Sequence, residues 1–344
     1  DKSRSRGLGD VYKRQDGGNI TLTATDSGAA GDDLTVATGV TITAAGGTGA
    51  ITLNAGDNVA LNGTALVTAA GSGAVTVTAD AGSVDAGGAI TMADGSQVVS
   101  GSGTLDLNAT DNVTLGRLMT TGNVTIDTTA GEVLDGGDTH TEIEADTATI
   151  TADGGIGEST GSGADAALET SLTTLNATTT AGSIQIDEAD GVTLASVTAG
   201  GAGDVRIVSA TGDLDVQVVT AADDLVALTA TSGAINDASG TEADNITASD
   251  VALRASTGIG DASTDADDLD LAVTNLAATT ATGDISISDD GTLDVTTVDG
   301  LMGVTITGAG DEILIREGTT TDGDFDISQT ISNAGTGNVT LFAG

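Results

Sequence analysis

Short triplets of the form aliphatic–polar–aliphatic recur along almost the whole sequence, and they constrain its fold more than any other feature. Examples are ITL at 20–22, VTV at 75–77, VTI at 124–126 and IQI at 184–186. A period of two places both aliphatic side chains on one face of a β-strand. Clusters of Gly, Asn and Asp, which tolerate positive φ in tight turns, separate the triplets. Helical periodicity is weak everywhere, and 164–172 comes closest to it. The chain is therefore predicted to be all-β, with many short strands.

A second, longer period is superimposed on the triplets. The string GEVLDGG at 131–137 corresponds to GAINDASG at 233–240, and the two copies start 102 residues apart. Similar correspondences continue downstream of both strings. An internal super-repeat is therefore predicted, with copies at approximately 131–232 and 233–334.

Two folds are consistent with this repetition. Tandem β-sandwich domains of about 100 residues would match the long period, but their cores normally use aromatic residues. Aromatic residues make up 1% of this chain, and it has no proline. A parallel β-helix, a solenoid of coils with two or three short strands each, has an interior of aligned aliphatic side chains and corners of Gly, Asn and Asp. We predict a repetitive parallel β-helix, with tandem β-sandwiches as the alternative.

The N-terminal stretch Asp1–Gln15 differs from the rest of the chain. It contains both lysines, Lys2 and Lys13, and the only tyrosine, Tyr12. Back-translated codon by codon, SRGLGDVYKRQ at 5–15 resembles a sequencing-library adapter of the transposase type. Residues 1–15 are accordingly predicted to be a non-native, disordered segment, and 16–344 to be one continuous β-helical segment. We expect this segment to be an internal fragment of a much longer protein.

The net charge of −42 restricts the possible partners. Phosphates would be repelled, so nucleic-acid binding is disfavoured, as is docking on an anionic membrane surface. No apolar run approaches the ~20 residues needed to span a bilayer, so direct membrane insertion is not expected. The chain has no cysteine and therefore no disulfide framework. Regularly spaced β-branched residues between the anions argue against disorder.

Strings such as GAITLNAGDNVAL (49–61), GNVTIDTTAG (122–131) and GSIQIDEADGVTLASV (182–197) resemble the repeat regions of large bacterial surface proteins. These are the filamentous-haemagglutinin-like exoproteins and related β-strand-repeat adhesins. The resemblance covers nearly all of 16–344 and is one of composition and period. It implies export to the cell surface or medium and a rod-like role in adhesion. It also implies a host or neighbouring cell surface, or matrix glycans, as partners, and it carries no catalytic residues.

Aspartates stand repeatedly just before a strand. If the turns stack at ~4.8 Å, neighbouring carboxylates repel by about 1 kcal/mol even in water. Ca²⁺ bridging between coils would relieve this repulsion, because hard oxygen ligands suit that ion. The alternative is that Asp simply favours turns and keeps the protein soluble. The Ca²⁺ candidates are Asp32, Asp33, Asp57, Asp111, Asp223, Asp224, Asp267, Asp268, Asp289 and Asp290. The calcium nonapeptide G-G-x-G-x-D is absent, since GGAGDV at 200–205 places Asp204 one residue early.

Other chemistry has little material in the sequence. His140 is the only histidine and is predicted to be a surface residue. The arginines beyond residue 15 are Arg117, Arg206, Arg254 and Arg316. A polysaccharide-active enzyme would need more basic residues and aromatics, so it is a minor alternative and no catalysis is predicted. We expect a structural stalk or adhesive segment of a very large secreted or cell-surface protein. The main alternative is a Ca²⁺-dependent ligand- or cell-binding module, and no other cofactor is expected.

Overall fold

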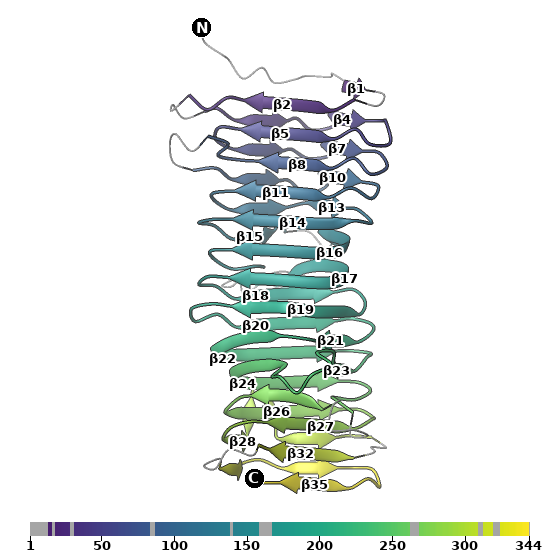
Figure 1. Cartoon of the computed structure of the whole chain (residues 1–344), viewed down its shortest axis with the longest axis vertical. Coiled ribbons are helices and arrows are strands. Elements are labelled where there is room, and N and C mark those ends of the chain that lie inside the picture. Colours follow the sequence, from purple (N-terminus) through teal and green to yellow (C-terminus); the bar gives the residue numbers. More distant parts are fainter. Residues whose placement is uncertain are drawn as a thin grey trace. The chain divides into compact units, whose positions relative to one another are not determined.

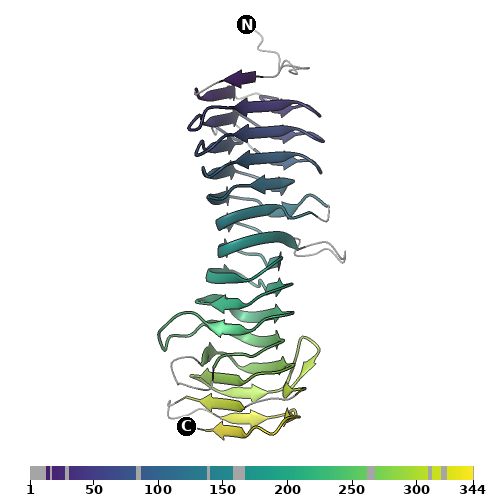
Figure 2. The ribbon, with the colours of Figure 1, turned by 90° about the vertical axis from the view of Figure 1, so that its right-hand side faces the viewer.

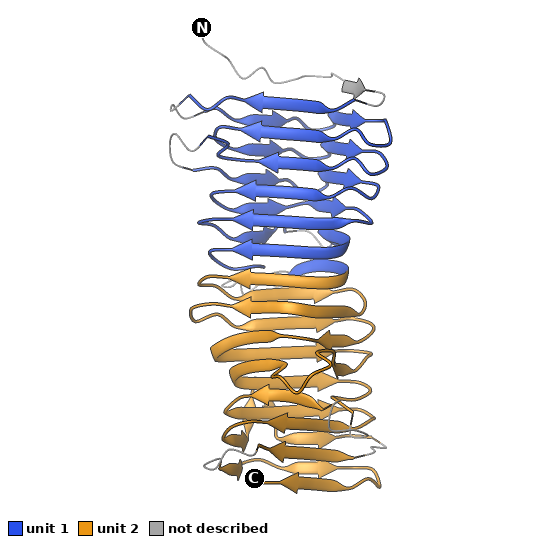
Figure 3. Cartoon of the chain, viewed as in Figure 1, with its two compact units in different colours: residues 1–172 blue, residues 173–344 orange. Residues whose placement is uncertain are grey.

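A computed structural model describes residues 13–15, 18–27, 31–82, 87–137, 140–157, 167–261, 268–308, 312–318 and 324–343. These ranges contain strands and turns but no helix, which confirms the predicted all-β class. The chain divides into two compact units, 1–172 and 173–344 (Figure 3). In each unit short strands of successive coils lie side by side in parallel (Figures 1 and 2), as a parallel β-helix requires.

Unit 1 contains three stacks of parallel strands. The first stack consists of β2 (Ile20–Ala24), β5 (Ile51–Ala55), β8 (Val75–Thr78), β11 (Leu105–Ala109) and β14 (Asn123–Thr128). The second consists of β1 (Lys13–Gln15), β4 (Thr41–Ala44), β7 (Leu66–Ala69), β10 (Gln97–Ser100) and β13 (Arg117–Met119). The third consists of β3 (Leu34–Val36), β6 (Val59–Leu61), β9 (Ile90–Met92), β12 (Val113–Leu115) and β15 (Val133–Asp135). β16 (Ile143–Ala152) pairs with both β13 and β14.

Pairing in register builds the core of unit 1 from columns of aliphatic side chains. Leu53, Val77, Leu107 and Ile126 are register partners on successive coils, and all four are buried. Along each strand the residues on either side of these aliphatic residues point outward, so buried and partly exposed residues alternate along β5 and β11. Each fully buried Leu, Val or Ile contributes about 1.5–3 kcal/mol. A narrow interior of this kind needs no aromatic residue.

Unit 2 repeats this design. One stack consists of β18 (Ile184–Glu188), β20 (Val205–Ser209), β22 (Val219–Ala230), β24 (Ile246–Ala255), β26 (Asn275–Thr280), β31 (Val304–Ile306) and β34 (Ile331–Asn333). A second contains β19 (Val192–Ala199), β21 (Leu214–Val216) and β23 (Ile235–Asp237), and β17 (Leu168–Thr179) pairs with β19 through its residues Thr174–Thr178. The remaining parallel strands are β25 (Leu269–Ala272), β27 (Ile285–Asp289), β28 (Leu293–Val295), β32 (Ile313–Glu317), β33 (Phe325–Ile327) and β35 (Val339–Phe342).

A β-hairpin interrupts the outer surface of unit 2. β29 (Thr297–Val298) and β30 (Leu301–Met302) are antiparallel, and the turn residues Asp299 and Gly300 both have positive φ, as a two-residue hairpin turn requires. Val298 is buried in a cluster with three outward-facing alanines, which are register partners on β22, β24 and β26: Ala227, Ala252 and Ala277. The hairpin therefore covers side chains that would otherwise face solvent.

Two details differ from the sequence-based expectations. Within the segment predicted to be disordered, the backbone of Lys13–Gln15 forms β1 and pairs with β4; 1–12 lie outside the described residues. In the window with the strongest helical pattern, 164–172, the described part from Leu168 onward belongs to β17. Its burial alternates along this part because the strand packs one face on the core.

Candidate functional site

The predicted aspartates of unit 1 accept hydrogen bonds from backbone amides. The Asp57 Oδ2 atom accepts from the amides of Gly31 and of Asp32, the latter at 2.9 Å. Asp33 Oδ1 accepts from the Asn58 amide at 3.1 Å, and Asp111 Oδ2 accepts from the Gly88 amide at 3.1 Å. Each bond links one coil to the next, so these carboxylates satisfy turn donors that strand pairing leaves over.

The predicted aspartates of unit 2 lie in more varied surroundings. Asp268 is buried, pairs with Arg316 and accepts a hydrogen bond from the Ser286 hydroxyl, so an arginine supplies its counter-charge. Asp289 is buried and accepts from the amides of Val273 and Gly291, both at 2.9 Å. The other four predicted positions are less informative: Asp223 and Asp290 are exposed, Asp224 is half-buried, and Asp267 lies outside the described residues.

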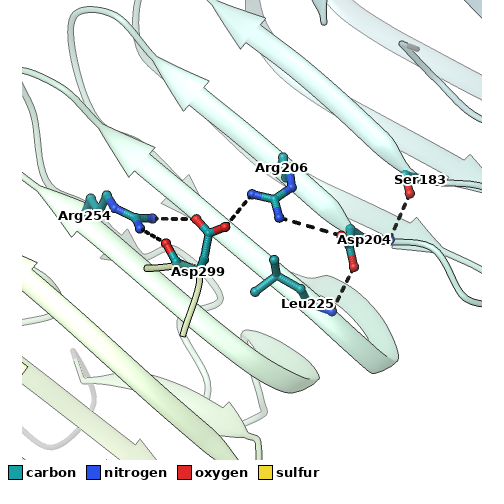
Figure 4. A network of polar contacts seen from close by, with 6 residues as sticks. All are labelled: Ser183, Asp204, Arg206, Leu225, Arg254 and Asp299. Atoms are coloured by element: carbon teal, nitrogen blue, oxygen red, sulfur yellow. Dashed lines mark hydrogen bonds and ion pairs between the residues drawn. The ribbon is translucent and has the colours of Figure 1, made fainter. Parts of the chain in front are cut away.

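Two arginines that are distant in sequence meet at the hairpin (Figure 4). Arg206 Nη1 lies 2.9 Å from Asp299 Oδ1, and Arg254 Nη1 lies 3.1 Å from Asp299 Oδ2. Arg254 Nη2 also donates to the main-chain oxygen of Asp299 at 2.7 Å. Arg206 lies 3.7 Å from Asp204, whose Oδ1 accepts from the amide of Leu225 at 3.3 Å. We call Arg206, Arg254 and Asp299 the hairpin clamp.

A different group of carboxylates, none of them predicted, has the geometry of a cation site. Among the described residues, Asp135, Glu142 and Glu169 form the one group of three acidic or histidine side chains whose ligand atoms all lie within 4.8 Å of one another. Glu142 is 1% exposed, whereas Asp135 and Glu169 are half-buried. Glu142 Oε2 accepts from the Glu169 amide at 2.8 Å, but Glu142 Oε1 has no hydrogen-bond donor. We call these three residues the acidic triad.

Burial and like charges raise the pKa values of several carboxyl groups. The pKa of Glu142 lies well above its usual range, first because burial removes water from the carboxylate and then because of the adjacent Glu169. In unit 2, burial raises the pKa of Asp270 to about 7, reinforced by the negative charges of Glu242 and other neighbours. Burial likewise raises the pKa of Asp289 to about 6 against the opposing effect of its two amide donors.

The sequence pattern did not single out the acidic triad, because its members are not adjacent to the conspicuous Asp pairs. Asp135 ends β15, Glu142 immediately precedes β16 and Glu169 lies in β17. A signal was nevertheless present in the super-repeat. When the two copies are aligned on their backbone hydrogen bonds, Asp135, Glu142 and Glu169 correspond to Asp237, Asn245 and Asp270, at separations of 102, 103 and 101 residues. Only the central position changes from an acid to an amide.

The remaining expectations concern the surface and the relatives of the chain. His140 is exposed, as predicted. Within the described ranges, no helix has the length and apolar character needed to cross a membrane. No protein-family model matches the chain, and neither the curated proteins nor the solved structures contain a match to it.

Proposed function

We propose that this chain is a structural segment, a stalk or an adhesive region, of a very large bacterial protein that is secreted or displayed on the cell surface, and that it has no catalytic role. The observation that carries the proposal is the repeated parallel pairing of the described strands within each unit, with columns of small aliphatic side chains inside. Architectures of this kind are stabilised by contacts between neighbouring repeats, so they can be lengthened by adding coils.

The use of the polar side chains supports the same role. Carboxylates such as Asp57 and Asp33 bind backbone amides across coils. Each arginine beyond residue 15 forms an ion pair with an Asp or Glu side chain: Arg117, Arg206, Arg254 and Arg316. Most of the polar chemistry on these strands thus holds the coils together. A catalytic centre, in contrast, gathers several titratable groups in a cleft.

The resemblance to filamentous-haemagglutinin-like adhesins is the basis for the location and the partners in this proposal. A stalk would bind nothing by itself and would hold other modules away from the cell. An adhesive segment would bind a host or neighbouring cell surface, or matrix glycans. The alternative, a Ca²⁺-dependent ligand- or cell-binding module, was predicted from the turn aspartates, and the acidic triad offers a separate basis for it.

Small-angle X-ray scattering of the purified chain tests the structural role. A stalk requires an extended particle, because each coil adds about 4.8 Å along the stacking direction. A compact particle, with the maximum dimension of a globular protein of equal mass, would refute it. Binding of the labelled chain to glycan arrays and cultured cells separates an adhesive segment from a passive stalk, with a globular protein of similar negative charge as the control.

A further inference from the structure

The super-repeat places the acidic triad and its counterpart in the same backbone frame. In the first copy, Leu118 N donates to Glu142 O at 2.6 Å, and Glu142 N donates to Glu169 O at 3.0 Å. In the second copy, Val219 N donates to Asn245 O at 2.7 Å, and Asn245 N donates to Asp270 O at 2.8 Å. The two central residues therefore occupy equivalent places between neighbouring coils.

The side chains of the central residues also begin alike. Glu142 Oε2 accepts from the Glu169 amide at 2.8 Å, and Asn245 Oδ1 accepts from the Asp270 amide at 2.9 Å. One oxygen of each side chain thus caps the same strand on the following coil. What distinguishes the two sites is the second atom of each group, the Oε1 atom of Glu142 and the Nδ2 atom of Asn245.

In the second copy this atom is a hydrogen-bond donor that satisfies the oxygen atoms around it. Asn245 Nδ2 donates to Asp237 Oδ1 at 2.6 Å and to the main-chain oxygen of Val216 at 3.0 Å. Asn245 is completely buried, and this network satisfies its amide. The first copy has a carboxylate oxygen in the equivalent place, and that oxygen has no donor. A carboxylate oxygen of Glu142 also lies within 4.8 Å of the ligand atoms of Asp135 and Glu169.

We propose that the acidic triad binds a divalent cation of the hard, oxygen-preferring class, with Ca²⁺ as the best fit, and that this cation does for the first copy what the Asn245 amide does for the second. Carboxylate oxygens are the ligands that Ca²⁺ and Mg²⁺ take in proteins. Three carboxylates are costly to bury together unless a positive charge joins them. Ca²⁺ suits the site better than Mg²⁺ because it accepts irregular coordination, whereas Mg²⁺ demands near-octahedral geometry.

The test is isothermal titration of the full chain with CaCl₂ after EDTA treatment and dialysis, in about 150 mM NaCl to screen diffuse binding. The key variant is Glu142→Asn, which copies the second site into the first. The matched control is Asp146→Asn, which removes one charge from an exposed position on the same strand, β16. We expect the wild type and Asp146→Asn to bind one more equivalent of Ca²⁺ than Glu142→Asn. We also expect Ca²⁺ to raise the melting temperature of the wild type and of Asp146→Asn at least twice as far as that of Glu142→Asn.

A second variant, Glu169→Gln, alters the half-buried rim of the triad and leaves Glu142 in place. It should lose the same equivalent of Ca²⁺, so the result does not depend on the folding of Glu142→Asn alone. The proposal would be overturned by identical isotherms, and equal Ca²⁺-induced shifts in melting temperature, for the wild type and either folded triad variant. That result would mean that a protonated Glu142 carboxyl does in the first copy what the Asn245 amide does in the second. Neither result bears on the scattering test of the structural role, so the two proposals fail separately.

Discussion

Removing the charge of Asp299 should weaken the attachment of the hairpin to the outer face of unit 2 without unfolding the coils beneath it. Asp299→Asn is the appropriate change, because Asp299 has a φ of 47° and Asn tolerates this left-handed region. The variant loses two ion pairs, at 2.9 Å to Arg206 and at 3.1 Å to Arg254. The bond from Arg254 to the main-chain oxygen of Asp299 does not depend on the carboxylate and remains possible.

The size of the effect follows from the exposure of the hairpin clamp. The side chains of Arg206, Arg254 and Asp299 are 39%, 29% and 25% exposed, so each ion pair is worth about 0.2–1 kcal/mol. Losing both ion pairs should lower the free energy of hairpin opening by about 1 kcal/mol. The buried side chain of Val298 is unaffected and continues to hold the hairpin on the three outer alanines. Partial release is therefore expected, with the hairpin still formed in most molecules.

Amide hydrogen exchange of a peptide covering 297–302 measures this opening directly. A loss of about 1 kcal/mol corresponds to roughly fivefold faster exchange. In about 1 M NaCl, where the Debye length is about 3 Å, the wild type should approach the variant. Arg117→Gln, which breaks the 2.8 Å ion pair with Glu144 in unit 1, is the control and should leave this peptide unchanged. Equal exchange of wild type and Asp299→Asn at low salt would refute the stabilising role of the clamp.

Three further predictions concern the interior. Leu107→Ala, at a fully buried position, should lower the unfolding free energy in urea by about 3–5 kcal/mol, and a loss below about 1 kcal/mol would contradict the close packing of the column. Arg316→Gln removes the counter-charge of the buried Asp268 and should cost about 3–5 kcal/mol, most of it regained in the double variant with Asp268→Asn. Burial raises the pKa of Asp289 to about 6 and that of Asp270 to about 7, so both hold their protons more tightly when folded than when unfolded. The stability they contribute is present near pH 4 and is lost as the pH rises through 6 to 7. The melting temperature should therefore fall from pH 5 to pH 8, with a flatter profile in Asp289→Asn, and a rise over this range would contradict the assignment.

The fold could be predicted from the sequence because its main signal, the aliphatic–polar–aliphatic triplet, is local. The triplets at 51–53 and 105–107 lie in β5 and β11, where the aliphatic residues are buried and the polar residue between them is partly exposed. The long strands β22 and β24 were not predicted. β22 runs through Asp223 and Asp224, where the register shifts, and a charged pair normally indicates a turn.

The acidic triad could not be predicted from the sequence, because its geometry depends on which residues face each other across coils. The step between register partners is 31 residues from Ile20 to Ile51 but 19 from Leu105 to Val124, so partners cannot be found by counting. The hairpin is an intermediate case. The Asp299-Gly300 pair is a strong turn signal, but nothing in the sequence shows that the hairpin covers Ala252 or that two distant arginines meet at its turn.

The parallel pairing within each unit also has a mechanical consequence. Among the described strands, an interior strand such as β11 pairs with β8 and β14, so a pull that peels one coil from the next breaks one short ladder at a time. Each step would release a coil of 18 to 32 residues, or roughly 60–115 Å of slack at about 3.3–3.6 Å per residue. A unit loaded in this way would lengthen in small increments and absorb work while the remaining coils stay intact. A globular domain, whose core fails all at once, has no such graded response to tension.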